Sequence, residues 1–120
     1  MNQLIFRRYF EVDDLLAKIN AFREERDWRQ FHNPKDLSIS ISLEAAELLE
    51  NFQWKTSEEV LNGDMENVKE EIADVLIYSL MLASDLNMDV SEIIEEKLHK
   101  NSLKYPIASS KGSSKKYTEL

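Results

Sequence analysis

Two pairs of acidic residues are the feature of this sequence whose type and spacing best suit chemistry. Glu44 and Glu47 are three residues apart, and so are Glu71 and Asp74. On a helix, residues at this spacing project from one face about a turn apart. Two such helices packed side by side would direct four carboxylates at one point, and carboxylate oxygens are ligands that Mg²⁺ or Mn²⁺ prefers. The spacing therefore predicts a divalent metal site between two helices.

The residues around these pairs argue against the alternative that the acids are only solvated. The pairs lie within the segments LEAAELLE and EEIADVLIY, where apolar residues flank them. Carboxylates at close range do not all stay ionised without a cation. Glu50 and Glu70 adjoin the pairs and could join or replace a ligand. Glu96 and His99 form a single Glu-x-x-His pair, whereas a di-iron bundle needs two, so a redox centre is not expected.

Composition limits the classes of function that remain. The 120 residues suit one domain, and 15 Lys and Arg against 23 Asp and Glu give a net charge of −8. That charge opposes binding to a nucleic acid polymer, but it allows a single phosphorylated ligand if divalent cations neutralise both sides. The absence of Cys excludes thiolate chemistry and suits a reducing cytoplasm. We find no secretory signal and no membrane-spanning stretch, and we expect a cytoplasmic protein.

The spacing of apolar residues predicts an all-α fold. Leu37 to Leu43 alternates apolar residues with Ser, which alone would indicate a strand, but the continuation rich in Leu, Ala and Glu favours a helix. We expect a connection over 27–35, a helix cap at Asp36, a short helical turn from Thr56 or Ser57 to Leu61, and a cap at Asp64. The four main helices are expected over residues 11–28, 37–54, 64–86 and 91–104.

These helices predict a four-helix, bundle-like single domain over residues 1–120. The second helix carries apolar residues on two faces, which favours burial on both sides in a homo-oligomer. Residues 106–120 form a polar, Ser- and Lys-rich tail that should be disordered or docked on a neighbour.

Four segments resemble a known family. The chain resembles the MazG-like all-α nucleotide pyrophosphohydrolases, and within them the dCTP pyrophosphatase branch, through RDWRQFHNPKDL, LEAAELLENFQWK, EEIADVLIYSL and an ending with KYP and GSSKKYTEL. The likeness runs from about Phe22 to the end of the chain. One departure is that the branch usually has glycines around the first motif Glu, where this chain has Leu43 and Ala46.

The resemblance implies that Glu44, Glu47, Glu71 and Asp74 hold magnesium, or manganese, as the metal ligands and catalytic residues. The implied reaction is hydrolysis of a nucleoside triphosphate between its α and β phosphates, in which the metal polarises the phosphorus and activates water. The products are a nucleoside monophosphate and pyrophosphate. Glu47 or Glu50 could orient or deprotonate that water, and the sequence leaves the choice open.

The resemblance also implies a substrate site. Its aromatic and polar residues for the base and sugar are Trp28, His32, Trp54 and Tyr78, with Phe31 as a further match. Its residues near the phosphates are Lys100, Asn101 and Lys104. The alternatives are that the aromatic residues pack in a core or an interface, and that the basic residues complement the dipole of a helix C-terminus.

The resemblance thus implies an enzyme that cleans or balances the nucleotide pool, acting on dCTP or a related deoxynucleotide. It implies a homotetramer of paired dimers, although a dimer is possible. The alternative is a non-catalytic helical assembly in which the acidic pairs form salt bridges between subunits with Arg23, Arg26 and Lys69.

Overall fold

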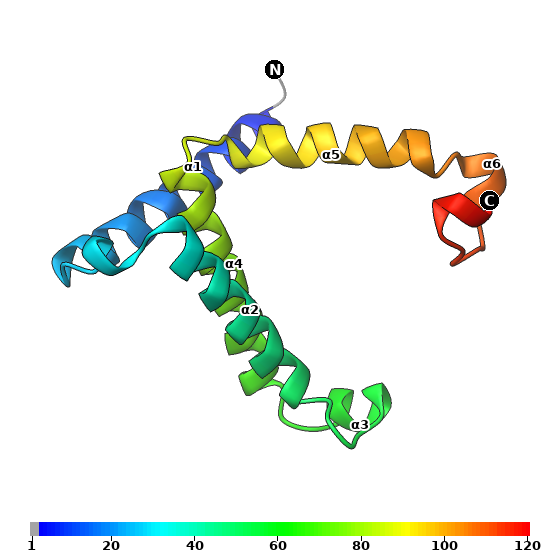
Figure 1. The fold of residues 1–120 in the computed structure, drawn as a ribbon, viewed down its shortest axis with the longest axis horizontal. Coiled ribbons are helices and arrows are strands. Elements are labelled where there is room, and N and C mark those ends of the chain that lie inside the picture. Colours follow the sequence, from blue (N-terminus) through cyan, green and yellow to red (C-terminus); the bar gives the residue numbers. More distant parts are fainter. Residues whose placement is uncertain (1–2) are drawn as a thin grey trace. The chain divides into compact units, whose positions relative to one another are not determined.

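The computed structural model describes residues 3–120, with side chains described from residue 11 onward. Within this range every regular element is helical, which confirms the all-α prediction (Figure 1). The elements are α1 (Gln3–Glu25), η1 (Arg29–Phe31), α2 (Pro34–Glu50), α3 (Ser57–Leu61), α4 (Glu66–Asp85), α5 (Val90–Lys104), α6 (Ile107–Ser110) and η2 (Tyr117–Glu119). They form two compact units, which divide between Asn87 and Met88. A single functional domain stays a prediction. Along the described residues, no helix combines the length and the apolar character needed to cross a membrane.

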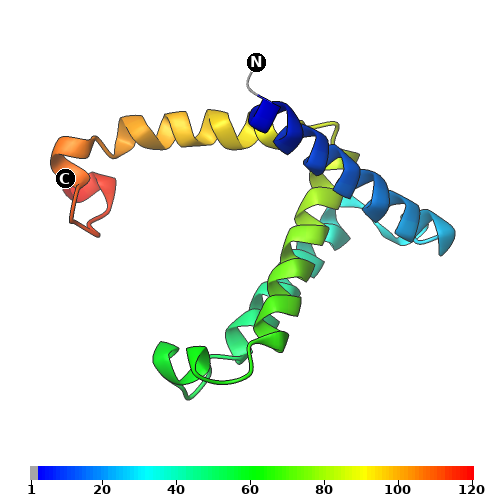
Figure 2. The same ribbon diagram turned by 180° about the vertical axis from the view of Figure 1, so that it is seen from behind.

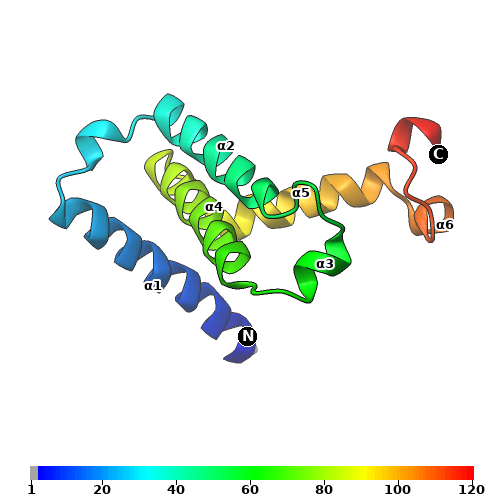
Figure 3. The same cartoon turned by 90° about the horizontal axis from the view of Figure 1, so that it is seen from below.

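The first unit is built on the packing of α2 against α4. These helices run antiparallel, side by side, and α3 lies in the connection between them (Figure 1). Seen from behind, α1 crosses α4 (Figure 2). A third view shows α4 between α1 and α2 (Figure 3). The carboxylate-bearing helices α2 and α4 are therefore direct neighbours.

The start of α2 corrects one prediction. Asp36 lies in the first turn of the helix, and the cap is Asn33, whose side-chain oxygen accepts a hydrogen bond of 2.9 Å from the Asp36 amide. Pro34 follows the cap, at the position where its missing N–H costs nothing and its fixed φ suits a helix. The helix therefore begins three residues before Leu37.

The predicted helices are confirmed, with shifted ends. Residues 37–43 are helical despite their strand-like alternation. However, α2 ends at Glu50, and Trp54 adopts a left-handed φ of 66° in the turn beyond it. Similarly, α1 ends at Glu25 because Asp27 has a φ of 54°, so Trp28 lies outside the helix. Trp54 thus lies outside α2, although the sequence predicted that this helix runs to residue 54.

Two polar residues begin α3 and α4 much as predicted. Thr56 caps α3 in a capping box with Glu59, where each side chain bonds the other residue's backbone N–H. Asp64 accepts a hydrogen bond of 3.0 Å from the Glu66 amide, although Met65 occupies the cap position of α4. These local bonds fix the connection that returns the chain from α2 to α4.

The buried apolar core of the first unit is small. Among the described residues it comprises Leu37, Val60, Val68 and Met81. By contrast, large apolar side chains on both central helices are exposed, including Leu43 on α2 at 58% and Leu76 on α4 at 56%. Exposed apolar area of this kind is typical of surfaces that bind a protein partner.

The second unit contains α5 and the C-terminal tail. Asp89 caps α5 by accepting a hydrogen bond from the Glu92 amide. The rings of Tyr105 and Tyr117 meet edge to face with centroids 6.0 Å apart, and the Lys104 ammonium lies 4.8 Å from the Tyr117 ring centroid. The tail therefore packs against the end of α5 in its own chain. The sequence had predicted that it would be disordered or would dock on a neighbouring subunit.

Candidate functional site

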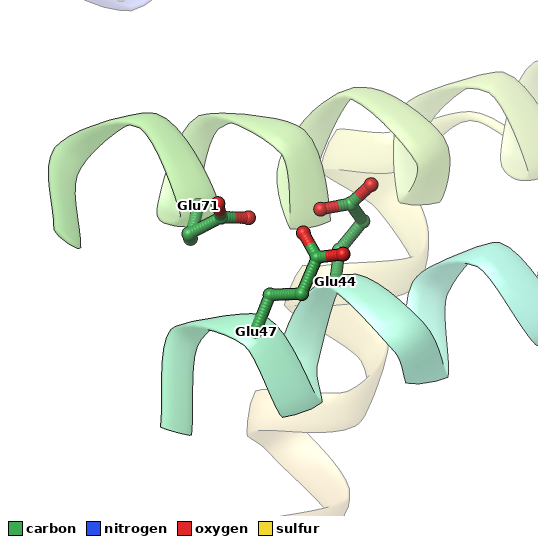
Figure 4. A group of neighbouring side chains, drawn as sticks. All are labelled: Glu44, Glu47 and Glu71. Carbon is green, nitrogen blue, oxygen red and sulfur yellow. The ribbon is translucent and has the colours of Figure 1, made fainter. Parts of the chain in front are cut away.

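The α2–α4 packing brings three of the four predicted carboxylates together. Glu44 and Glu47 from α2 and Glu71 from α4 each offer one oxygen, and these oxygens all lie within 4.8 Å of one another (Figure 4). Opposite ligands of a bound Mg²⁺ are about 4 Å apart. Small side-chain movements would thus allow one cation to contact all three residues. We call these residues the acidic cluster.

Asp74 lies beside the acidic cluster. It is on α4, three residues after Glu71, and its charge raises the pKa of both Glu44 and Glu71. Asp74 also lines an adjoining cavity. It therefore connects the acidic cluster to a space that can hold a ligand.

The electrostatics of the acidic cluster favour a cation. Burial, hydrogen bonds with Glu47 and Glu71, and the charges of Glu47 and Asp74 raise the pKa of Glu44 from 4.5 to about 7. Burial also raises the pKa of Glu71, and the nearby charges of Glu47 and Asp74 add to that effect. One carboxylate oxygen each of Glu44 and Glu71 is buried without a hydrogen-bond partner in the described chain. Such oxygens lose solvation without compensation, so this donor set fits a divalent metal.

The adjoining cavity has a volume of about 400 Å³, within the range of small-molecule sites. Three of the predicted substrate residues, Trp28, His32 and Tyr78, lie on its wall with Asp74. The other lining residues are Lys18, Ile19, Phe22, Ile77 and Met81. The cavity is therefore largely apolar, with Asp74 and Tyr78 on the side near the acidic cluster.

The aromatic side chains on one side of the cavity are in contact with one another. The Trp28 ring meets the Phe22 ring edge to face at 5.6 Å and the His32 ring at 6.3 Å. The Arg26 guanidinium lies 3.8 Å from the Phe22 ring centroid. Trp28 is thus held at the cavity edge by α1 on one side and by His32 on the other.

Two polar groups on the cavity wall are kept uncharged at neutral pH. Burial and the charges of Arg23 and Arg29 lower the pKa of His32, although Asp85 acts in the opposite sense. Burial, together with the charges of Glu44, Asp74 and Glu47, raises the pKa of Tyr78. The Tyr78 hydroxyl therefore keeps its proton and can donate it in a hydrogen bond to a ligand.

Two other aromatic residues lie away from this cavity. Trp54 is 93% exposed in the turn after α2, and Phe31 is 63% exposed. Neither is among the residues that line the cavity. A substrate role for Trp54 therefore stays a prediction.

The predicted phosphate-side residues belong to the second unit. Lys100, Asn101 and Lys104 lie on the last turns of α5. The backbone oxygen of Asn101 accepts a hydrogen bond from the amide of Tyr105, the residue at the C-terminal cap of α5. Their contact with phosphate stays a prediction.

Comparisons with known proteins identify the family of this chain. The MazG-like family model matches residues 39–120, a segment that contains all four predicted metal ligands. The chain belongs to the MazG-like family. It is 38% identical to mouse dCTP pyrophosphatase 1 and 39% identical to the human protein, over 91% of this chain and 67% of each relative. A solved structure of a pyrophosphatase from Archaeoglobus fulgidus is 45% identical, with a TM-score of 0.76 over 80% of this chain and 93% of that one.

The sequence analysis of this MazG-like chain missed part of the cavity wall. Lys18, Ile19 and Phe22 line it from α1, and Ile77 and Met81 line it from α4. Each set follows the three- and four-residue spacing of one helix face. This spacing is visible in the sequence, but it indicates only an apolar helix face, because the cavity exists only where the two helices meet.

The alternative of a non-catalytic assembly required Arg23, Arg26 and Lys69 to pair with the acidic residues between subunits. In this MazG-like chain each of them contacts another residue of its own chain. Arg23 pairs with Asp85, and Lys69 lies 3.7 Å from Glu66. Arg26 lies on the Phe22 ring. Within the described part of the chain, none of these three cations forms an ion pair with the acidic cluster.

Proposed function

We propose that this chain hydrolyses a deoxynucleoside triphosphate, dCTP or a close relative, to the nucleoside monophosphate and pyrophosphate. The observation that carries the proposal is that Asp74 both adjoins the acidic cluster and lines the cavity formed with Trp28, His32 and Tyr78. A carboxylate metal site next to an aromatic cavity suits a ligand with a base at one end and phosphates at the other. The mouse and human relatives are named dCTP pyrophosphatase 1, which supports this reaction, and the archaeal relative is named a pyrophosphatase.

In this proposal Glu44, Glu47, Glu71 and Asp74 hold Mg²⁺, with Mn²⁺ as a substitute. When bound, the metal supplies Lewis-acid activation of the α phosphate and neutralises the triphosphate charge. Glu47 is the most exposed member of the acidic cluster. It can therefore accept a proton from the attacking water, with Glu50 as the alternative base.

The cavity accounts for binding of the base and sugar. The Trp28 ring offers an apolar face for stacking, and the protonated Tyr78 hydroxyl and the neutral His32 ring offer hydrogen bonds. We place Trp54 at the base, and Lys100, Asn101 and Lys104 near the phosphates, on the resemblance of their motifs. Apolar walls close to the sugar would disfavour a ribose hydroxyl that finds no partner there.

We also propose a cytoplasmic homotetramer made of paired dimers that serves to clean or balance the nucleotide pool. The exposed Leu43 and Leu76 side chains support self-association, and the lack of Cys suits a reducing compartment. Analytical ultracentrifugation of the full chain tests the assembly. A monomer at micromolar concentration would contradict it, and a dimer would revise it.

The function is tested by pyrophosphate release from the eight common ribo- and deoxynucleoside triphosphates. Wild type and Glu47→Ala are assayed side by side, with Mg²⁺ and with a chelator. We expect release that requires the metal, is strongest with a deoxynucleotide and is lost in the variant. If a folded, Mg²⁺-loaded wild type releases no pyrophosphate from any of them, the proposal for common nucleotides is wrong.

A further inference from the structure

A buried ion-pair network lies beside the cavity, outside the proposed metal and substrate groups. The Arg23 side chain has no exposed surface and donates hydrogen bonds from both terminal nitrogens to the Asp85 carboxylate, one of them at 2.8 Å. Its Nε donates to the Asn20 side chain at 3.1 Å. Burying a charged guanidinium is costly unless it is paired in this way. The network therefore fixes α1 to the end of α4.

The same carboxylate also anchors the connection between α1 and α2. The Arg29 Nη1 lies 3.3 Å from the Asp85 Oδ1, and the Arg29 Nε donates to Glu24 at 3.0 Å. Asp85 is the last residue of α4, where the helix dipole disfavours a negative charge. Its two arginine partners compensate, and they hold the pKa of Asp85 below its usual value, chiefly through the hydrogen bond from Arg23.

The anchored segment carries the aromatic side of the cavity. Arg29 begins η1, directly after Trp28, and the His32 amide donates to the Arg29 backbone oxygen at 3.1 Å. The Trp28 amide donates to the Arg23 backbone oxygen at 2.9 Å. Both cavity residues of this segment are therefore bonded through the backbone to an arginine that holds Asp85.

We propose that Arg23, Arg29 and Asp85 are positioning residues, whose network fixes Trp28 and His32 against α4 and so sets the affinity of the cavity for the nucleotide base. This inference rests on the proposed function for the identity of the ligand. It predicts that loosening the network weakens substrate binding more than turnover, because the acidic cluster is held separately by α2 and α4.

Arg29→Gln is the deciding variant, since it releases the segment but keeps the buried pair of Arg23 and Asp85. We expect KM for the best triphosphate to rise about tenfold or more while kcat changes less than about threefold. Arg29→Lys keeps the charge and should restore part of the loss. Lys35→Gln removes a cation from an exposed pair with Asp36 and should leave both parameters unchanged.

Three readouts separate positioning from a general loss of structure and do not depend on turnover. Hydrogen exchange at the Phe31 and His32 amides should be faster in Arg29→Gln than in wild type or Lys35→Gln. Mn²⁺ affinity, measured by calorimetry, and the Tm should stay at the wild-type values. If wild type hydrolyses no triphosphate, the proposed function fails, but hydrogen exchange still tests the anchoring of the segment.

Asp85→Asn tests the buried end of the network. It leaves Arg23 without a counter-charge, so we expect a lower Tm and a raised KM at temperatures where the variant is folded. Glu66→Gln is the matched control, since it makes the same chemical change in an exposed pair on the same helix. Unchanged KM and unchanged exchange in Arg29→Gln would overturn the proposal, as would a fall in kcat accompanied by weaker Mn²⁺ binding.

Discussion

Glu44 and Glu71 come from different helices, yet each places a carboxylate oxygen within 4.8 Å of the other. Each also has one buried oxygen without a hydrogen-bond partner in the described chain. Two acids in this arrangement repel each other and share protons unless a cation lies between them. Without a metal, the contact between α2 and α4 therefore destabilises the folded protein. This effect can be measured in variants of the two residues.

Glu71→Gln should separate folding from metal binding. The amide removes a negative charge from the acidic cluster, so the metal-free variant should melt no lower than metal-free wild type. Loss of a ligand should abolish the Mn²⁺-induced rise in Tm and reduce turnover at least about a hundredfold. Differential scanning calorimetry with and without Mn²⁺ measures the first effects, and pyrophosphate release measures the last.

Glu70→Gln is the neighbouring comparison for this experiment. Glu70 is exposed and adjoins Glu71, so its variant should bind Mn²⁺ like wild type. Equal losses in the two variants would show that Glu70 is also a ligand, and losses confined to Glu70→Gln would contradict the assignment of Glu71.

The stability of the metal-free protein should depend on pH through Glu44. The pKa of this group is about 7 in the folded chain, against an ordinary value of 4.5. Between these values the folded state binds more protons than the unfolded state, so this contribution to stability is present at low pH and is lost as pH rises through about 7. In a chelator, the amount by which the Tm of Glu44→Gln exceeds that of wild type should grow from about pH 5 to about pH 8. A difference that does not vary with pH would contradict this assignment.

Trp28→Ala should weaken binding of the base. Stacking of a base on an aromatic ring contributes about 1–3 kcal/mol, so KM should rise about tenfold or more. Phe31→Ala is the control, because Phe31 is largely exposed and does not line the cavity. Steady-state kinetics with the preferred triphosphate measure both variants, and a comparable rise in Phe31→Ala would show that the loss is not specific to the cavity.

Lys100→Ala should raise KM for the triphosphate if α5 contacts its phosphates. A charge-assisted hydrogen bond to phosphate makes a rise of about tenfold reasonable, and added salt should reduce the difference from wild type. Lys97→Ala removes the same charge about one turn earlier on α5 and should have little effect. If both lysine variants respond alike, a general charge effect explains the result better than a phosphate contact.

The sequence by itself predicted the local structure of this protein and the type of its candidate metal ligands. Apolar spacing predicted the main helices, Thr56 and Ser57 were the predicted starts of α3, and the two spaced acid pairs predicted a carboxylate site. These features depend on residues within a turn or two of each other, where helix geometry fixes which side chains share a face.

Only the tertiary structure decided how these parts meet. The packing of α2 on α4 put Glu71 beside Glu44, and the crossing of α1 over α4 made a cavity that includes Phe22 and Met81. The left-handed conformation of Trp54 put that residue outside the helix that was expected to run to residue 54. The buried pair of Arg23 with Asp85 likewise joins residues far apart in the chain. These features depend on contacts between segments that are distant in the sequence. The spacing of residues along one helix does not indicate which other surface that helix will pack against.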